Sequence, residues 1–448
     1  MQRLVFQFIC CVTIALCSSC SLQKKLDTSA KSNLINDSLL ASAHIGISIF
    51  EPATNKFWYN YQADKFFTPA SNTKIVTCYA GMKYLGDSLV GMRYAEKGND
   101  LIIQPTGDPT LLHREYKNQP IVSFLQHSGK KISIIANNWQ DNAWGSGWSW
   151  DDYTSSDMAD RSPLPVYGNT IKFVQTQTEE DFVELSNKPQ TTVYTEPEID
   201  WKLKFSADTS SHSFSVRRNL GENVFNVTEG KEKYRELSVP FVTNGLDAAL
   251  ELLKDTVGKE ISVIEKSTVP LSQFHAIKSQ AADSVFKPMM HRSDNFFAEQ
   301  TLLMVSNQML GVMSDEKIID TLLKTDFKDF PQKPNWADGS GLSRYNLFTP
   351  QDFIWLLNKI KTEFPWSRIS NIFATGNTGT LTNYYIADST FIYAKTGTLS
   401  GVVALSGYLI TKKNKTLIFS VLVNNHQTTG RAVRRSIEKF IQSVREKY

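Results

Sequence analysis

The C-terminal part of the chain carries the pattern that most restricts its fold. Three apolar runs predict consecutive strands at 391–394, 402–410 and 416–423, and the polar run 412–415 predicts a hairpin turn between the last two. A helix follows, because apolar residues recur there at helical spacing: Val433, Ile437, Phe440, Ile441 and Val444. This order predicts an antiparallel sheet covered by a helix.

The beginning of the folded chain predicts a hairpin and a helix that complete the same sheet. Ile45, Ile47 and Ile49 alternate with smaller or polar residues, and a turn at 52–55 leads into the run 57–59. Pro69 lies where the first turn of a helix would begin, ahead of the apolar run 75–85. We therefore expect an α/β (α+β) fold, with an antiparallel sheet made from both chain ends and helices flanking it.

The middle of the chain looks inserted. Between residues 94 and 281 the apolar runs are short, and one loop is rich in tryptophan: Trp139, Trp144, Trp148 and Trp150. We predict a main domain over 43–93 and 282–448, interrupted by one or two smaller domains over 94–281.

The composition is that of a globular protein without a nucleic-acid partner. The 448 residues are 41% hydrophobic and 11% aromatic, enough to bury a full core. With 48 basic and 45 acidic residues the formal net charge is +3, so the chain lacks the large excess of positive charge that binds a nucleic-acid phosphate backbone.

The first residues predict export. Arg3 precedes an apolar run over 4–16 that is too short for a permanent membrane span, so residues 1–19 are interpreted as a signal peptide. The polar composition of residues 20–42 predicts a tether. Only Cys78 lies in the body of the chain, so no internal disulfide forms there, and its apolar neighbours predict a buried, inert thiol.

The candidate nucleophile is Ser71, followed one helical turn later by Lys74. The string Ser-x-x-Lys also occurs at Ser21, Ser128, Ser314 and Ser436. Only Ser71 lies at a predicted helix start, where a lysine one turn on can reach its hydroxyl. Lys74 must be neutral part of the time to accept the proton, which requires burial or a second cation nearby.

Two further motifs follow in order along the chain. Ser293-Asp294-Asn295 precedes an apolar segment, and Lys395-Thr396-Gly397 ends a predicted strand near the C-terminus, where Lys395 would supply the second cation. Ser-x-x-Lys, Ser-Asp-Asn and Lys-Thr-Gly in this order are known in class A β-lactamases and penicillin-binding proteins.

On these motifs the sequence resembles the penicillin-recognising serine enzymes, and within them the class C low-molecular-mass penicillin-binding proteins, which are D-alanyl-D-alanine carboxypeptidases and endopeptidases. The segments 106–111, 150–152 and 338–344 are similar to that family, as is the long interval between Ser71 and Ser293. After the Trp-rich loop the chain departs from the family pattern with Val166-Tyr167-Gly168-Asn169. The resemblance implies a penicillin-binding/β-lactamase-like transpeptidase fold.

The resemblance also implies roles for individual residues. Ser71 would attack the penultimate D-alanine, Lys74 would act as the base, and Ser293 would pass the proton to the leaving amine. The substrate would be held by Asn295, Lys395, Thr396, Gly397 and Thr398, with the backbone N–H groups of Ser71 and Thr398 as the oxyanion hole. His291, Arg292, Asp294, Glu299 and His426 are expected to be structural.

The implied partners are peptidoglycan stem peptides, with β-lactam antibiotics as covalent inhibitors. The resemblance of residues 16–20 to a lipobox implies acylation of Cys20, and hence a periplasmic protein with a lipid anchor. We expect no cofactor and, without His or Cys at metal-ligand spacing, no metal. Two alternatives stay open: a β-lactamase or esterase of the same fold, and a non-catalytic lipoprotein that binds muropeptides.

Overall fold

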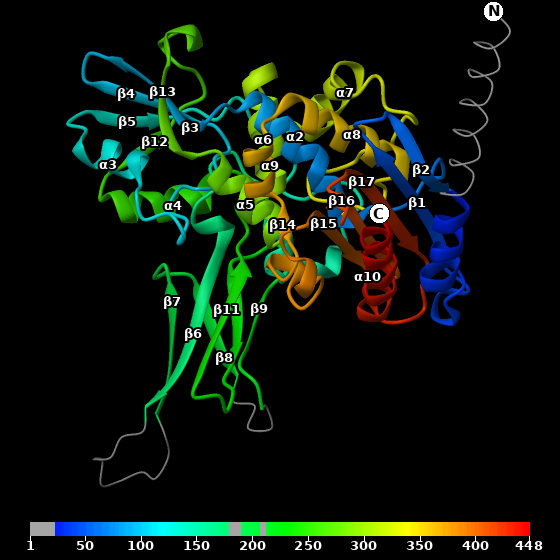
Figure 1. The fold of residues 1–448 in the computed structure, drawn as a ribbon. Coiled ribbons are helices and arrows are strands. Elements are labelled where there is room, and N and C mark those ends of the chain that lie inside the picture. Colours follow the sequence, from blue (N-terminus) through cyan, green and yellow to red (C-terminus); the bar gives the residue numbers. More distant parts are fainter. Residues whose placement is uncertain (1–22, 179–189, 207–211) are drawn as a thin grey trace, which may run out of the picture. The chain divides into compact units, whose positions relative to one another are not determined.

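A computed structural model describes residues 23–178, 190–206 and 212–448 (Figure 1). The chain forms two compact units, and the first runs to Tyr79 and resumes over Lys287–Ser293 and Thr321–Tyr448. The second comprises Ala80–Phe286 and Asp294–Asp320. The chain passes between the units within three helices, or directly beside them: α2 (Lys74–Tyr84), α5 (Asp283–His291) and α7 (Asp315–Lys324). The domain limits predicted from the sequence stay a prediction.

The first unit is built on a six-stranded antiparallel sheet in the order β14-β15-β16-β17-β1-β2. Its strands come from both chain ends, as predicted: β1 (His44–Glu51), β2 (Lys56–Tyr61), β14 (Ala374–Thr375), β15 (Ile392–Leu399), β16 (Val402–Ile410) and β17 (Thr416–Asn424). The N-terminal and C-terminal strands join where β1 pairs with β17, with Ile47 opposite Val421. The sequence underestimated β15, which continues through Lys395-Thr396-Gly397, and it did not predict the two-residue strand β14.

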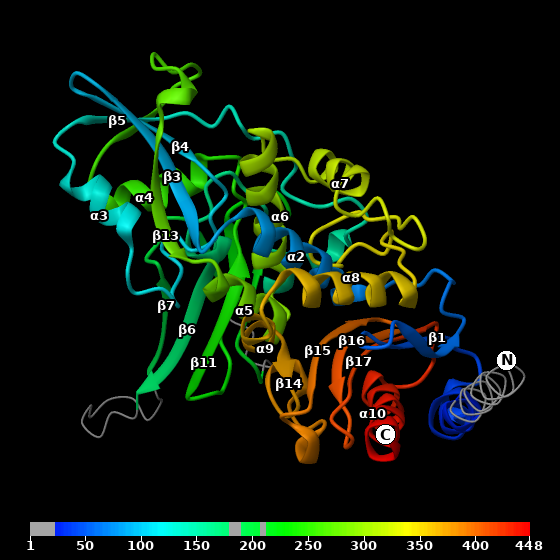
Figure 2. The ribbon, with the colours of Figure 1, turned by 45° about the horizontal axis from the view of Figure 1, so that its top comes forward.

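Helices cover both faces of this sheet (Figure 2). The apolar stripe of α10 (Gly430–Lys447) is buried against one face, where Ile45, Ile47 and Ile49 point toward it. The other face is covered by α8 (Pro350–Glu363), whose Leu357 carbonyl accepts a hydrogen bond from the Tyr408 hydroxyl at 2.8 Å. A further helix, α9 (Trp366–Ile372), precedes β14. The predicted antiparallel sheet with flanking helices is confirmed.

The sequence predicted a tether over residues 20–42, whereas the described part of this segment is folded. Residues 23–30 are helical, Lys31–Ile35 form a π-helical turn, and Ser38–Leu40 form a 3₁₀ turn. Three leucines and one alanine of this segment join the same core as α10: Leu26, Ala30, Leu34 and Leu40. Three of them recur every fourth residue, so a polar segment still presents one apolar stripe to the sheet.

The second unit holds more strands than its short apolar runs suggested. A five-stranded sheet has the order β12-β5-β4-β3-β13, with bounds β3 (Ser88–Lys97), β4 (Asp100–Pro105), β5 (Lys131–Ile134), β12 (Ile261–Val263) and β13 (His275–Ala281). Two three-stranded sheets are formed by β6 (Thr170–Thr178), β7 (Gln190–Glu196) and β11 (Tyr234–Pro240), and by β8 (Lys202–Ser206), β9 (Ser215–Arg218) and β10 (Val224–Thr228). The helices of this unit are α3 (Pro120–His127), α4 (Asp247–Val257) and α6 (Asn295–Leu310).

Candidate active site

Ser71 lies in a 3₁₀ turn, Ala70–Thr73, that leads directly into α2. The sequence predicted a helix start here, and the structure adds that its first turn is 3₁₀. Ala70 adopts a left-handed conformation with φ of 48°, a backbone state that a non-glycine residue holds only when its surroundings enforce it. The Thr73 hydroxyl donates to the Ala70 carbonyl at 2.9 Å and closes the turn. The turn fixes the position of the Ser71 hydroxyl.

Two glycines let neighbouring segments approach this turn. A Cβ atom on Gly397 would lie 2.6 Å from the Pro69 carbonyl oxygen and 3.1 Å from the Ser71 nitrogen. A Cβ atom on Gly341 would lie 2.0 Å from the Ala70 carbonyl oxygen. Strand β15 and the loop around Gly341 therefore approach the backbone of the Ser71 segment more closely than a residue with a side chain would permit.

Lys74 is completely buried and points at the candidate nucleophile. Its Nζ donates to Ser71 Oγ at 3.0 Å and to the Ser340 carbonyl at 2.7 Å. The two bonds hold the amine in reach of the serine proton, which is the geometry that a general base requires.

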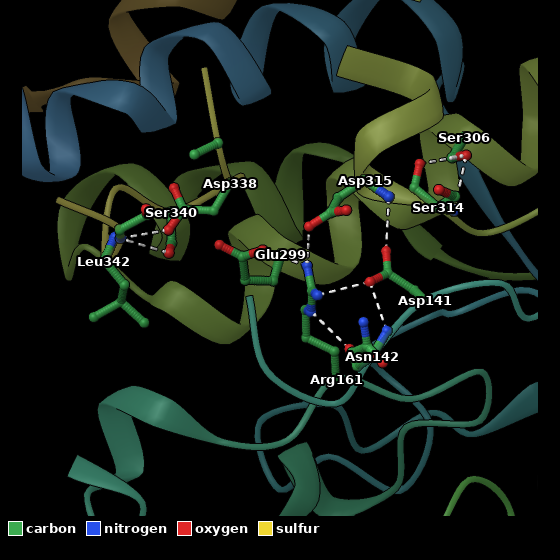
Figure 3. Close-up of polar contacts among 12 residues, drawn as sticks. Asp141, Asn142, Arg161, Glu299, Ser306, Ser314, Asp315, Asp338, Ser340 and Leu342 are labelled. Carbon is green, nitrogen blue, oxygen red and sulfur yellow. Dashed lines mark hydrogen bonds and ion pairs between the residues drawn. The ribbon is translucent and has the colours of Figure 1, made fainter. Parts of the chain in front are cut away.

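The loop that carries Ser340 is organised by the buried carboxylate of Asp338 (Figure 3). Asp338 accepts hydrogen bonds from the backbone nitrogens of Gly341 at 2.8 Å and Ser343 at 2.6 Å. The neighbouring Gly339 carbonyl accepts from Thr77 of α2 at 2.6 Å. From the sequence, this segment was similar to the family but had no predicted role. In the structure, its Ser340 carbonyl accepts a hydrogen bond from Lys74.

Lys395 is buried on β15 and contacts Ser293. Its Nζ donates to Ser293 Oγ at 2.9 Å and to the Thr396 carbonyl at 2.6 Å. Ser293 itself has φ of 64°, a second strained non-glycine position. Burial, and then the charge of Lys74, hold the pKa of Lys395 well below its usual range. Two lysines in one buried site disfavour each other's charge, so a neutral amine is available there.

Asn72 links the Ser71 turn to the sheet. In the amide orientation that satisfies both ends of its side chain, its nitrogen donates to the Lys395 carbonyl at 2.8 Å and its oxygen accepts from Ser406 Oγ at 2.7 Å. Ser406 lies opposite Lys395 in the pairing of β15 with β16. Sequence reasoning missed Asn72 and Ser406, because a contact between a helix start and a strand so distant in the chain leaves no local signal.

The remaining predicted site residues of β15 have side-chain partners outside the nucleophile segment. Thr396 Oγ1 donates to Thr380 Oγ1 at 2.7 Å, and Thr398 Oγ1 accepts from Arg434 of α10 at 2.7 Å. Asn295 belongs to the second unit, where it begins α6 and donates to the Asp157 carbonyl at 2.9 Å. The structure thus brings together Ser71, Lys74, Ser293 and the Lys395 segment within the first unit.

Two of the residues expected to be structural, Glu299 and His426, have polar contacts away from the nucleophile. Glu299 lies 3.4 Å from the buried guanidinium of Arg161, which also contacts Asp141 and Asp315 (Figure 3). The ring of His426 contacts the Thr428 carbonyl just beyond the end of β17. Cys78 is fully buried, as predicted. Among the described residues no cluster of His, Cys, Asp or Glu is arranged to hold a metal ion.

One known family matches the chain over almost its whole length. The model of the D-Ala-D-Ala carboxypeptidase 3 (S13) family matches residues 26–446. The chain belongs to this family. This S13 enzyme is a serine-type D-alanyl-D-alanine peptidase, a hydrolase of carboxypeptidase or endopeptidase type.

Curated relatives agree with the family over nearly the whole chain. The S13 enzyme is 25% identical to a D-alanyl-D-alanine carboxypeptidase of Actinomadura sp. (strain R39), over 88% of this chain and 80% of the relative. It is 22% identical to the D-alanyl-D-alanine carboxypeptidase DacB of Haemophilus influenzae, over 96% of this chain and 95% of the relative.

Solved structures share the fold of the S13 enzyme. Penicillin-binding protein 4 of Haemophilus influenzae superimposes with a TM-score of 0.71 at 19% identity, covering 94% of this chain and 98% of that one. The same protein in complex with a β-lactam superimposes with a TM-score of 0.67 at 19% identity, covering 90% of this chain and 95% of that one. The penicillin-binding fold implied by the sequence is confirmed.

Proposed function

We propose that the S13 enzyme cleaves its substrate through an acyl-enzyme on Ser71, with Lys74 as the general base. The observation that carries this proposal is the position of Lys74 Nζ, 3.0 Å from Ser71 Oγ and 2.7 Å from the Ser340 carbonyl. Lys395 is buried in the same site, where the charge of one lysine disfavours protonation of the other.

The reaction follows from these contacts. Lys74 takes the proton of Ser71 as the serine oxygen attacks the carbonyl carbon of the penultimate D-alanine. The backbone N–H groups of Ser71 and Thr398 stabilise the oxyanion, each by roughly 2.7–4 kcal/mol. The C–N bond then breaks, and Ser293 passes the proton to the leaving amine. Water hydrolyses the resulting ester and restores the Ser71 hydroxyl.

Substrate recognition is assigned to the strand and loop that border Ser71. Lys395 and Thr396 face the terminal carboxylate of the peptide. Gly397 keeps β15 close to the Ser71 segment, since a Cβ atom there would lie 3.1 Å from the Ser71 nitrogen. Strand β14 pairs with β15 at Tyr393 and Ala394, so an extended peptide would bind alongside the residues of β15 that follow.

The substrates we propose are peptidoglycan stem peptides and their cross-links. β-Lactams present an amide carbonyl to the same serine and would acylate it, and the fold neighbour from Haemophilus influenzae has been solved with a β-lactam. We further propose that the enzyme is exported to the periplasm and anchored by acylation of Cys20. Cys20 and the signal peptide lie outside the described residues, and within those residues no helix is long and apolar enough to cross a bilayer.

Product analysis tests this assignment. The purified enzyme should convert muropeptides that end in D-Ala-D-Ala, or their cross-linked dimers, to products identified by mass. Ser71→Ala should release none, and Lys74→Ala should slow product formation by about 10²- to 10⁴-fold. Ser128→Ala, in a matching Ser-x-x-Lys string, should retain full activity.

Three outcomes would contradict the proposal. Product release by Ser71→Ala would exclude this serine as the nucleophile. Rapid turnover of a penicillin without cleavage of muropeptides would favour a β-lactamase. Binding of muropeptides without any product would favour a binding protein.

A further inference from the structure

A cavity of about 230 Å³ lies in the second unit, lined by residues of that unit alone. Its walls come from the end of α2, from β3, β13 and α6, and from Thr106 just beyond β4. Its polar lining comprises Tyr84, Arg93, Thr106, Lys278, Asn307 and Gln308, and its apolar lining includes Leu85, Val90 and Met304. The proposed catalytic residues Ser71, Lys74, Ser293 and Lys395 belong to the first unit.

Arg93 is a partly buried cation without a carboxylate partner among the described residues. Its Nη2 donates to Gln308 Oε1 at 3.2 Å, a neutral acceptor that orients the guanidinium. Burial is the cause that lowers the pKa of Arg93, with no acidic neighbour to offset it. A buried arginine is usually neutralised by carboxylates, as is Arg161 of the same unit, which contacts three of them. A guanidinium that is partly removed from water and has no carboxylate partner favours binding of an anion.

A second cation borders the same cavity. Lys278 is exposed, and its Nζ donates to the Ser88 carbonyl at 3.1 Å. The ladder between β13 and β3 shifts register on both sides of this residue. Such bulges redirect side chains and are common beside functional sites.

The amides in the lining also offer donors. Asn307 is 3% exposed, and its oxygen accepts from Asn138 Nδ2 at 3.1 Å, which leaves its amide nitrogen for the cavity. The oxygen of Gln308 is engaged by Arg93, so its nitrogen is likewise left as a donor. The Thr106 hydroxyl donates to the Val90 and Gly91 carbonyls, which fixes this side chain in the cavity wall. No carboxylate lines the cavity.

We propose that this cavity is a binding site for a small carboxylate with a short apolar group, such as the C-terminal end of a peptide. The carboxylate accepts hydrogen bonds from Arg93, Lys278 and the two amides, and the apolar group packs on Leu85, Val90 and Met304. The planar fork of Arg93 suits a carboxylate, and the apolar wall favours an acyl-amino acid over a bare inorganic anion.

Methionine methyl NMR tests this site without interference from the catalytic centre. The full-length protein is labelled with ¹³C-methyl methionine, and the Met304 signal is assigned with Met304→Leu. N-acetyl-D-alanine should shift the Met304 signal saturably, and N-acetyl-D-alaninamide, which has the same shape without the charge, should not. Arg93→Gln should weaken binding at least tenfold, and Arg93→Lys should weaken it less.

Matched observations make the result decisive. Arg93→Gln should retain the methionine spectrum of the folded protein and its labelling by a fluorescent penicillin, which separates this site from the proposed function. An unchanged Met304 signal, an equal shift with the neutral amide, or full binding by Arg93→Gln would overturn the proposal. Inorganic phosphate that binds where N-acetyl-D-alanine does not would also overturn it.

Discussion

At the scale of single residues, the position of the nucleophile depends on two glycines, because neither carries a Cβ atom. Gly397 lets β15, and Gly341 lets the Asp338 loop, pack directly against the backbone of residues 69–71. A Cβ atom at either position would clash with a carbonyl oxygen of that backbone. The sequence shows the glycine of the Lys-Thr-Gly motif, but it does not show which carbonyl group that glycine contacts in the fold. The motif predicted the strand and the site, whereas the contact required the fold.

Gly397→Ala should slow acylation of Ser71 while the protein remains folded. The new methyl group would lie 2.6 Å from the Pro69 carbonyl oxygen, so the strand or the turn must shift. A displacement of this kind is commonly worth about 10²-fold in rate. The rate of labelling by a fluorescent penicillin measures the loss. Gly129→Ala is the control, because a Cβ atom there meets nothing within 4 Å, and equal rates for the two variants would contradict the account.

The buried Lys395 should make stability depend on pH. Its pKa is well below 10.5 in the folded protein, so between that lowered value and 10.5 the unfolded chain binds more protons than the native one. The free energy of unfolding should therefore rise with pH in this window, by up to about 1.4 kcal/mol per pH unit.

Urea unfolding of the wild type and of Lys395→Met, from about pH 6 to about pH 9, measures this term. The difference in unfolding free energy should move in favour of the wild type as pH rises. Lys56→Met, at an exposed lysine at the start of β2, should show no such trend. A pH-independent difference for Lys395→Met would contradict the buried-lysine assignment.

At the scale of elements, the long strands of the first unit and its terminal helix followed from the sequence, because they carry apolar runs or a clear periodic pattern. The N-terminal segment did not, since its charged and polar residues outweigh a stripe of a few apolar ones. Its partners are α10 and the sheet, and the Tyr59 hydroxyl of β2 donates to Asp27 at 3.2 Å. A stripe of four-residue spacing inside a polar segment was the available signal.

Leu34→Ala should destabilise the protein by about 2–5 kcal/mol, because Leu34 is fully buried in the core shared with α10. Chemical unfolding gives the value. Leu39→Ala, five residues later and 54% exposed, should change stability by less than about 0.5 kcal/mol. If both substitutions were equally mild, the segment would behave as the tether that the sequence predicted.

Arg161 connects three elements of the second unit through buried ion pairs. Arg161→Met should cost about 3–5 kcal/mol at neutral pH, because Asp141, Glu299 and Asp315 would face one another without a cation. The loss should shrink as the pH falls toward about 6, because burial raises the pKa of Asp141 to about 6 even beside Arg161, and without Arg161 its carboxyl takes up a proton at higher pH. Unfolding at two pH values tests this, with the exposed Arg217→Met as control. A loss that grows on acidification would contradict it.

At the scale of the whole molecule, the order of three weak motifs predicted the family that the comparison confirmed. Ser71, Ser293 and Lys395 lie far apart in the sequence, and the first unit collects them because its sheet takes strands from both chain ends. The sheets of the second unit escaped prediction, because short strands with mixed burial lack a clear period. The cavity around Arg93 likewise has no sequence signal, since four separate elements and a loop residue form it.

Ser71 is the residue that the proposed mechanism acylates. Peptide mapping by mass spectrometry after reaction with a penicillin locates the acylated residue directly. We expect one adduct, on the peptide that contains Ser71, unchanged in Ser128→Ala and absent in Ser71→Ala. An adduct on any other residue, or an adduct that survives in Ser71→Ala, would contradict it.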